Sequence, residues 1–308
     1  MSSEKIPLLK CGTVAVIGAA NAGKSTLVNG LVGEKVSIVS PKVQTTRNRV
    51  MGIAIRKNAD YAAQIILVDT PGIFAPKSRL DTAMVGAAWA GAEESDMIAY
   101  LFDAKKKGPN DGDLKAIERL ASLVKNRPVF LILNKIDQIQ KPKLLALTVR
   151  LNELCPFTAT YMISALNGDG VEDVAKGLIR HIPEGDWIYD EDQTTDMPMR
   201  LLAAEITREQ IFRQLHDEVP YEITVETEKW EDFGNGDIRI SQIIHVTRDH
   251  LKSIILGKGG TRLQQIGARA RAELEEMTGT KVHLKLFVRV SEKWKDDPDY
   301  YAQWGLEI

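Results

Sequence analysis

Cysteine is scarce in this chain, and the two cysteines, Cys11 and Cys155, lie far apart without C-x-x-C spacing. They indicate ordinary thiols in a reducing compartment rather than a disulfide framework. The five histidines are scattered, whereas a structural zinc site needs clustered ligands. No run approaches the ~18 apolar residues of a membrane-spanning helix, and the start, Met1 to Lys10, lacks the apolar stretch of a signal peptide. We therefore expect a cytoplasmic protein that touches a membrane at most peripherally.

A strong charge of either sign is also missing, because the formal net charge of the 308 residues is only -2. Any surface that binds nucleic acid must therefore be local. The hydrophobic fraction of 44% and the charged fraction of 27% are ordinary for a globular protein. The length predicts about two domains of roughly 150 residues each.

Residues 1–182 alternate apolar, β-branched runs with helical patterns. The predicted strands are Thr13–Ile17, Val50–Ile55, Ile65–Val68, Met97–Phe102, Val129–Leu133 and Thr160–Ile163. The predicted helices are Gly23–Val32, Thr82–Glu94, Asp111–Val124, Lys141–Leu154 and Val171–Arg180. Strands that are apolar on both faces and separated by helices predict a mostly parallel α/β sheet covered on both sides.

Residues 183–198 interrupt this rhythm. The acidic residues crowd together without a basic one, at Glu184, Asp186, Asp190, Glu191, Asp192 and Asp196, and prolines bracket them. This composition predicts a solvated linker.

Residues 199–294 follow another order, which is helix, two strands, two helices and a last strand. The expected elements are Met199–Leu215, Tyr221–Trp230, Ile238–Thr247, Leu251–Leu256, Arg262–Met277 and Val282–Val290. They predict a second, smaller α+β domain, and residues 295–308 remain as a tail.

The first motif is G-x-x-x-x-G-K-[ST], which lies between a predicted strand and a predicted helix, the context that it requires. Glycines let successive backbone N–H groups face a phosphate, and the helix presents its positive end to the same charge. Lys24 would reach the β- and γ-phosphates, and Ser25 would offer a hydroxyl to Mg²⁺. The expected phosphate-binding residues are Gly18, Ala19, Ala20, Asn21, Ala22, Gly23, Lys24, Ser25 and Thr26, together with Gly72.

Further motifs follow predicted strands. Asp69, Thr70, Pro71 and Gly72 end the strand Ile65–Val68. Asp69 can serve Mg²⁺, and the N–H of Gly72 can sense the γ-phosphate. A β-turn is the alternative for this Pro-Gly pair, but its position after a buried strand favours the phosphate site.

The base is read by a motif after the strand Val129–Leu133. The Asp137 carboxylate can accept from N1–H and the 2-amino group of guanine, and adenine offers neither group. Asn134 would brace the loop, the stem of Lys135 would cover the ring, and the N–H of Ala165 would face the guanine oxygen. The expected guanine-binding residues are Asn134, Lys135, Asp137, Ser164, Ala165 and Leu166.

Four such motifs at the carboxyl ends of strands identify a resemblance to the translation-factor-like class of P-loop GTPases. That class places a mobile loop between the first helix and the second strand. Here Thr46 is the expected Mg²⁺ ligand from this loop, with Thr45 as the alternative. The expected Mg²⁺ ligands are thus Ser25, Thr46 and Asp69, and the expected switch residues are Gln44, Thr45, Thr46, Asp69, Thr70, Pro71, Gly72 and Ile73.

Ile73 stands where Ras-like enzymes have a glutamine that orients the attacking water. Isoleucine cannot hydrogen-bond water, so we expect slow intrinsic hydrolysis or another group in this role. Related GTPases with an asparagine at the position of Asn21 use it to hold a K⁺ ion, so this resemblance implies K⁺-stimulated turnover.

A G-x-x-G turn, Gly257-Lys258-Gly259-Gly260, separates two predicted helices. Alone it is a weak signal, but the element order resembles a type II KH domain, in which this loop clamps the backbone of about four nucleotides. From 249 to 290, eight basic residues stand against four acidic ones. The expected RNA-binding residues are Gly257, Lys258, Gly259, Gly260 and Arg262.

Together, a GTPase domain and a type II KH domain resemble the Era family of bacterial ribosome-assembly GTPases, from Val14 to Trp294. Gln44 to Arg47, Asp69 to Gly72 and Pro220 to Glu226 match its pattern, whereas Ala20 stands where the family often has proline. The resemblance implies a GTP/GDP switch that binds small-subunit ribosomal RNA near its 3′ end and assists maturation of the small ribosomal subunit. It also implies a monomer with peripheral contact to the cytoplasmic face of the inner membrane.

The alternative is a GTP-dependent scaffold or membrane-associated signalling GTPase whose second domain binds protein. RNA binding discriminates between the two. An ATPase is a more distant alternative, which the guanine-reading motif disfavours.

Overall fold

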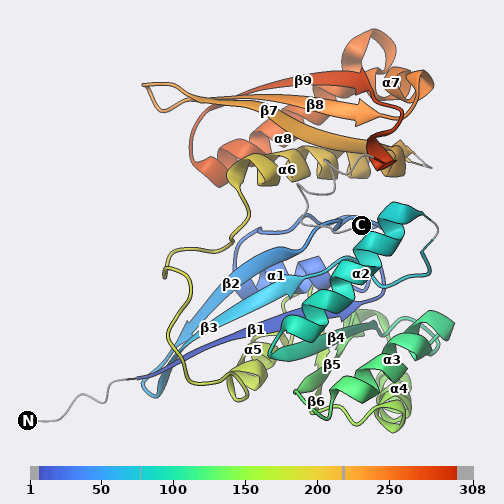
Figure 1. Ribbon diagram of the computed structural model, residues 1–308, viewed down its shortest axis with the longest axis vertical. Helices are drawn as coiled ribbons and strands as arrows, with labels where there is room; N and C mark the ends of the chain where they lie inside the picture. Colours follow the sequence, from blue (N-terminus) through green and yellow to red (C-terminus); the bar gives the residue numbers. More distant parts are fainter. Residues whose placement is uncertain (1–6, 77, 217–218, 297–308) are drawn as a thin grey trace, which may run out of the picture. The chain divides into compact units, whose positions relative to one another are not determined.

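The computed structural model describes residues 7–76, 78–216 and 219–296. The chain divides into two compact units, of which the first contains the described residues up to Ser37 and the stretch Thr46–Asp196. The second contains Ile38–Thr45 and continues from Met197. Each unit has its own sheet, as Figure 1 shows.

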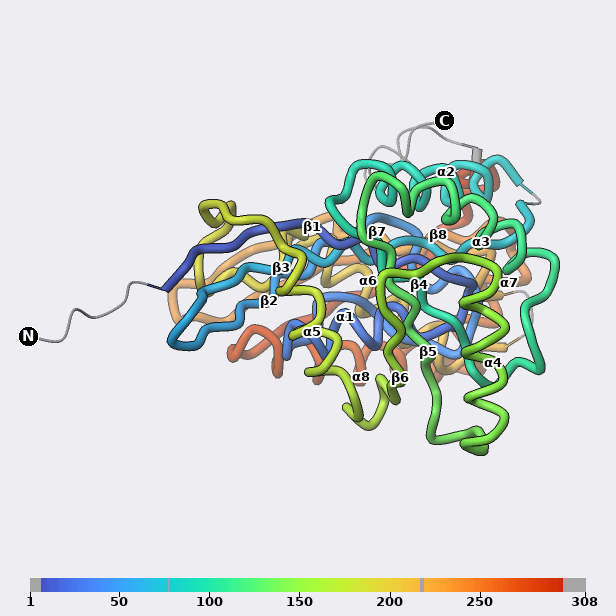
Figure 2. The backbone as a smooth tube through the Cα atoms, turned by 90° about the horizontal axis from the view of Figure 1, so that it is seen from below, coloured from blue at the N-terminus to red at the C-terminus, as the bar shows by residue number. Residues whose placement is uncertain are grey.

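The sheet of the first unit has the strand order β2-β3-β1-β4-β5-β6. Its strands are β1 (Leu8–Gly18), β2 (Val50–Lys57), β3 (Tyr61–Asp69), β4 (Met97–Asp103), β5 (Val129–Asn134) and β6 (Ala159–Ile163). All neighbours run parallel except β2, which pairs antiparallel with β3. Figure 2 shows β2, β3 and β1 running alongside one another. The strand β1 begins at Leu8, earlier than the sequence predicts, because it pairs with β3 from Tyr61 onward.

Helices cover both faces of this sheet. They are α1 (Lys24–Val32), α2 (Arg79–Glu94), α3 (Asp111–Leu123), α4 (Lys141–Leu154) and α5 (Val171–Ile179). One apolar core lies between the sheet and helices α1 and α5, and a second lies between the sheet and helices α2, α3 and α4. The strands β4 and β5 are buried nearly throughout, which explains why both read as unbroken apolar runs.

Helices α2 and α3 begin where the sequence provides capping boxes. The Ser78 side chain accepts from the N–H of Asp81, and the Asn110 side chain accepts from the N–H of Asp113. Each aspartate carboxylate in turn accepts from the backbone N–H of its capping residue. These boxes satisfy N–H groups that a helix start leaves without partners.

The segment from Pro183 to Asp196 differs from the solvated linker that its composition predicts. It belongs to the first unit, because the fully buried Gln64 of β3 holds it. The Gln64 amide donates to the carbonyl of Tyr189, and its oxygen accepts from the N–H groups of Ile188 and Tyr189. The acidic side chains face solvent, while the backbone of the segment pairs with the sheet. The acidic composition therefore did not indicate that the backbone is held.

The second unit contains a mixed sheet with the order β7-β8-β9. Its elements are α6 (Met199–Gln214), β7 (Ile223–Asp232), β8 (Ile238–Val246), α7 (Asp249–Leu256), α8 (Thr261–Thr278) and β9 (Val282–Val290). The pair β7–β8 is antiparallel and the pair β8–β9 is parallel. Helices α6 and α8 lie side by side against one face of the sheet (Figure 1).

This arrangement confirms the predicted fold class, a mostly parallel α/β unit followed by a smaller α+β unit. Ile255 of α7 and Ile266 of α8 lie fully buried in the core of the second unit. Within the described ranges, no helix is long and apolar enough to cross a membrane.

Candidate functional site

The motifs of the first unit gather at one edge of its sheet. The strands β1, β3, β4, β5 and β6 run parallel, so their carboxyl ends meet at that edge. The phosphate loop follows β1, Asp69 ends β3, Asp103 ends β4, Asn134 ends β5, and Ser164 follows β6. This edge is where ligands bind in open α/β sheets.

The phosphate loop from Gly18 to Ser25 requires backbone conformations that favour glycine. Gly18 has φ 154° and Gly23 has φ 100°. A Cβ at Gly18 would collide with the main-chain oxygen of Leu101, and a Cβ at Gly23 would collide with the side chain of Asn134. Helix α1 then starts without a side-chain cap, so N–H groups of its first turn remain to receive an anion.

Lys24 lies buried beneath this loop. Its ammonium donates to the main-chain oxygens of Gly18, at 3.3 Å, and Ala19, at 3.2 Å. Burial lowers the pKa of Lys24 to about 8, although nearby Asp69 acts in the opposite direction. A bound phosphate would stabilise the charged form of Lys24, because its anionic oxygens would replace the neutral carbonyls as hydrogen-bond acceptors.

Three oxygen donors meet beside the phosphate loop, one from each residue expected to hold Mg²⁺. The Ser25 hydroxyl lies 2.9 Å from the Thr46 hydroxyl and donates to Asp69 Oδ2 at 2.6 Å. Asp69 is fully buried, and this burial raises the pKa of its carboxyl group. Among the described residues, Asp69 Oδ1 has no hydrogen-bond partner. A buried carboxylate oxygen without a partner, flanked by hydroxyls, fits a hard cation that prefers oxygen ligands.

Thr45, the alternative to Thr46, points elsewhere. Its hydroxyl donates to the carbonyl of Lys42 at 2.6 Å and lies 2.6 Å from the hydroxyl of Ser40. Gln44 beside it has φ 56°, a left-handed conformation, which turns the chain between Lys42 and Thr46.

The stretch Ile38–Thr45 clusters with the second unit, although no sequence pattern predicts this. There the Arg208 guanidinium of α6 donates to the carbonyls of Gln44 and Thr45. The N–H of Val39 donates to the Glu209 carboxylate at 3.2 Å. The side chains of Arg208 and Glu209 are nearly fully buried. Buried charged groups need polar partners, and the backbone of this stretch provides them.

Asp69 to Ile73 lies against the phosphate loop. The hydroxyl of Thr70 donates to the carbonyl of Val16, and the N–H of Ile73 donates to that of Gly18, each at 2.9 Å. A Cβ on Gly72 would approach the backbone of Ala20 to 2.8 Å, so only glycine permits this contact. The Ile73 side chain packs against the core beneath helices α2 to α4 and can hold no water.

Asn134 joins three loops. Its Nδ2 donates to the carbonyl of Ala22 at 2.7 Å, while its Oδ1 accepts from the N–H groups of Lys135, at 2.8 Å, and Ala165, at 2.9 Å. The expected bracing role therefore has a definite geometry. It also assigns the Ala165 N–H to Asn134, whereas the sequence suggested the guanine oxygen as its partner.

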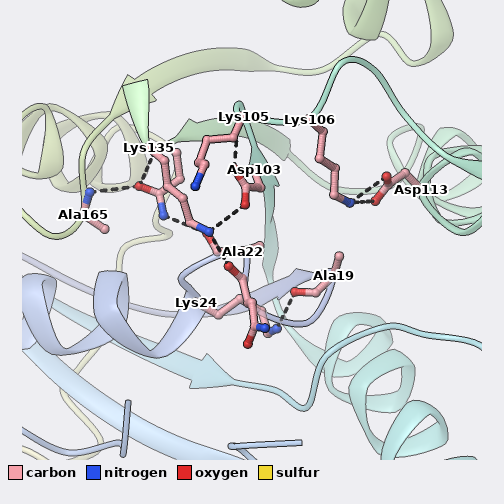
Figure 3. Close-up of polar contacts among 11 residues, drawn as sticks. Ala19, Ala22, Lys24, Asp103, Lys105, Lys106, Asp113, Lys135 and Ala165 are labelled. Atoms are coloured by element: carbon pink, nitrogen blue, oxygen red, sulfur yellow. Dashed lines mark hydrogen bonds and ion pairs between the residues drawn. The ribbon is translucent and has the colours of Figure 1, made fainter. Parts of the chain in front are cut away.

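Lys135 extends toward the phosphate loop, as Figure 3 shows. Its ammonium donates to the carbonyl of Asn21 at 2.7 Å and pairs with Asp103 at 2.6 Å. Asp103 was not foreseen from the sequence, although its place at the end of β4 is the same signal that identified the other motifs. The pair holds the lysine stem across the space beside the loop.

Asp137 is exposed in a short 3-10 helix, Ile136–Gln138. The Ser164 hydroxyl lies near enough to lower the pKa of the Asp137 carboxyl, although it falls short of full hydrogen-bond geometry. The carboxylate is thus ionised near neutral pH and can accept from a base. Leu166 in the neighbouring loop is 80% exposed.

The second candidate site is the turn between α7 and α8. Gly257, Gly259 and Gly260 all have positive φ, from 62° to 79°. Lys258 is exposed, and a Cβ on Gly259 or Gly260 would meet nothing within 4 Å, so this backbone is open to close approach. Arg262 instead turns back, and its guanidinium donates to the carbonyl of Ile254 at 2.8 Å.

Comparisons with known proteins agree with both sites. Residues 13–135 match the family described as 50S ribosome-binding GTPase, and residues 218–295 match the KH domain family. The chain is 53% identical over 308 residues to the GTPase Era of Afipia carboxidovorans, covering 100% of this chain and 98% of the relative. It is 53% identical over 307 residues to the GTPase Era of Bradyrhizobium diazoefficiens, covering 100% and 97%.

Two solved structures are similar across both units. Aquifex aeolicus Era Y63A bound to GDP and AlF₄⁻ has a TM-score of 0.90 at 40% identity, covering 97% of this chain and 100% of that one. Era in complex with MgGDPNP and nucleotides 1506–1542 of 16S ribosomal RNA has a TM-score of 0.89 at 40% identity, with the same coverage. With its phosphate loop, its guanine-reading loop and its second unit all in place, the chain is a GTP-hydrolysing enzyme that uses Mg²⁺ and belongs to the Era family of GTPases.

Proposed function

We propose that this GTPase is a switch that binds small-subunit ribosomal RNA near its 3′ end and assists maturation of the small ribosomal subunit. One observation carries the proposal. The turn Gly257–Gly260 presents an exposed lysine and open glycine backbone between two helices, as a loop that clamps a nucleic-acid backbone requires. The complex of a 40% identical Era with nucleotides 1506–1542 of 16S ribosomal RNA supports this choice of RNA.

Hydrolysis depends on groups that the first unit holds in place. The first-turn N–H groups of α1 and the Lys24 ammonium would face the phosphates, where negative charge grows in the transition state. Mg²⁺ held by Ser25, Thr46 and Asp69 would add positive charge at the same oxygens. Asn134 and Lys135 hydrogen-bond the base-reading loop to the phosphate loop. These bonds would couple base recognition to phosphate recognition.

The stretch Ile38–Thr45, which leads directly to Thr46, would link the nucleotide state to the second unit. Thr46 stands at the Mg²⁺ site, while the residues just before it cluster with the second unit. Loss of the γ-phosphate would remove contacts that hold Thr46 at this site. The hydrogen bonds that Arg208 makes to Gln44 and Thr45 would then be altered. We expect the GTP-bound form to be the RNA-competent one.

The test is a charge reversal in the turn. Lys258→Asp with Gly259→Asp should weaken binding of a 3′-terminal small-subunit RNA fragment at least tenfold, because the carboxylates repel phosphate where backbone should approach it. The matched control is Lys143→Asp with Gly185→Asp, which makes the same charge change at exposed positions of the first unit. A circular dichroism spectrum and a thermal unfolding curve like those of the wild type would show that the second unit of the turn variant folds, because GTP hydrolysis reports only on the first unit. Equal RNA affinity for the turn and control variants would rule out the proposal and favour a protein-binding second unit.

We propose further that K⁺ accelerates hydrolysis through Asn21. Support comes from Ile73, which packs into the core and cannot orient water, and from Asn21, which lies in the phosphate loop with φ 61°. K⁺ should raise the turnover rate above that in Na⁺, and Asn21→Ala should abolish the difference. Asn152→Ala, on helix α4 away from the loop, should keep it. Equal rates of the wild-type enzyme in both salts would contradict the proposal.

A further inference from the structure

Ser37 lies outside every motif, yet its hydroxyl reaches the Mg²⁺ site. It donates to Asp69 Oδ2 at 2.6 Å, and its side chain is buried. The same oxygen accepts from Ser25, also at 2.6 Å. Two hydroxyls therefore converge on one oxygen of the carboxylate, while the other, Oδ1, has no hydrogen-bond partner in the part of the chain that the structure describes.

Asn29 holds Ser37 in this position. Its Nδ2 donates to the carbonyl of Ser37 at 2.7 Å, and its Oδ1 accepts from the N–H groups of Val36, at 3.0 Å, and Ser37, at 2.9 Å. Asn29 lies four residues after Ser25 on α1, so the two side chains project from the same face of the helix. One helix thus supplies a group of the Mg²⁺ site directly and fixes a second hydroxyl indirectly.

The chain path explains how Ser37 returns to this helix. Helix α1 ends at Gly33, which has φ 89° and donates its N–H to the carbonyl of Asn29. This left-handed C-cap reverses the chain and brings Val36 and Ser37 back along the helix. Ser37 is also the last residue of the first unit before the stretch Ile38–Thr45, which leads to Thr46.

We propose that Ser37, locked by Asn29, is a positioning residue that orients the Asp69 carboxylate for Mg²⁺-dependent nucleotide binding. Its hydrogen bond to Oδ2 fixes the rotation of the carboxylate, and Oδ1 would then be the oxygen that remains to serve Mg²⁺. Without it, Asp69 keeps the hydrogen bond from Ser25, but its carboxylate can rotate. The inference concerns the first unit and stands independently of RNA binding.

The test compares the release of GDP from Ser37→Ala in the presence and in the absence of Mg²⁺. The Mg²⁺ concentration that half-maximally slows release of a fluorescent GDP should rise about tenfold, the effect of one hydrogen bond to a charged group. Release in EDTA, where Mg²⁺ is absent, should be unchanged. Ser37→Thr retains a hydroxyl and should stay near wild type, while Ser37→Cys, a weak donor of similar size, should behave like the alanine variant.

The control is Ser95→Ala, which deletes a buried hydroxyl that donates to the carbonyl of Gly91 instead of to Asp69. It should leave the Mg²⁺ dependence unchanged. An unaltered half-maximal Mg²⁺ concentration in both Ser37→Ala and Ser37→Cys would overturn the proposal. A rise in release that is equally large in EDTA would also overturn it, because that result assigns Ser37 a purely structural role.

Discussion

Asn134 offers the sharpest test of how the nucleotide site is built. Asn134→Ala removes one donated and two accepted hydrogen bonds, all to main-chain groups of three different loops. The side chain is only 3% exposed, so water cannot readily replace these bonds. A net contribution of about 0.5–1.5 kcal/mol for each bond gives roughly 1.5–4.5 kcal/mol in all.

This loss divides between two measurable quantities. Part appears as a lower free energy of unfolding, and part as weaker GDP binding, because a nucleotide must then order the loops itself. At about 1.4 kcal/mol for each tenfold change, the whole effect in binding would be roughly a 10- to 1000-fold weaker affinity. Denaturant unfolding without nucleotide and titration with fluorescent GDP give the two parts separately.

A second substitution separates the loops. Asn134→Asp keeps the oxygen that accepts from Lys135 and Ala165 but loses the donor to Ala22, and it sets a carboxylate against a carbonyl. It should therefore impair binding through the phosphate loop alone. If the losses of stability and of affinity in Asn134→Ala together stay below about 0.5 kcal/mol, the hydrogen bonds do not hold the site together.

Two further predictions concern charge and base selection. Burial lowers the pKa of Lys24 to about 8, and bound phosphate favours the charged form, so GDP affinity should be nearly constant below about pH 7 and fall about tenfold from pH 7 to pH 9. Lys24→Arg, which stays charged throughout, should lose this decline; a wild-type affinity that is flat to pH 9 contradicts the buried ammonium. Asp137→Asn should shift preference from guanine toward xanthine nucleotides in competition binding, and retained GTP selectivity would refute the base-reading argument.

Periodicity predicted the elements well where burial is uniform. The strand Val129–Leu133 was predicted one residue short of β5, and the helix Lys141–Leu154 coincides with α4. Starts were less accurate where local pairing decides them. The first strand begins at Leu8 because β3 continues alongside it, and α2 begins at Arg79 because Ser78 caps it.

The motifs named the residues of the site, but the residues that brace them depend on tertiary contacts. Asp103, Ser37 and Asn29 carry no motif of their own, and their roles arise only when β3, β4 and α1 converge. The same reason explains the acidic segment after Pro183, where one buried glutamine outweighs a polar composition. The monomeric state and the contact with the inner membrane stay predictions.

The RNA that the protein binds inside cells distinguishes a switch that binds ribosomal RNA from a GTPase whose second unit binds protein. The protein would be crosslinked to RNA in its wild-type form and in a form locked with GTP, and the attached RNA sequenced. We expect reads to concentrate at the 3′ end of the small-subunit ribosomal RNA, more strongly for the GTP-locked form. Reads that merely follow RNA abundance, with no difference between the two forms, would contradict it.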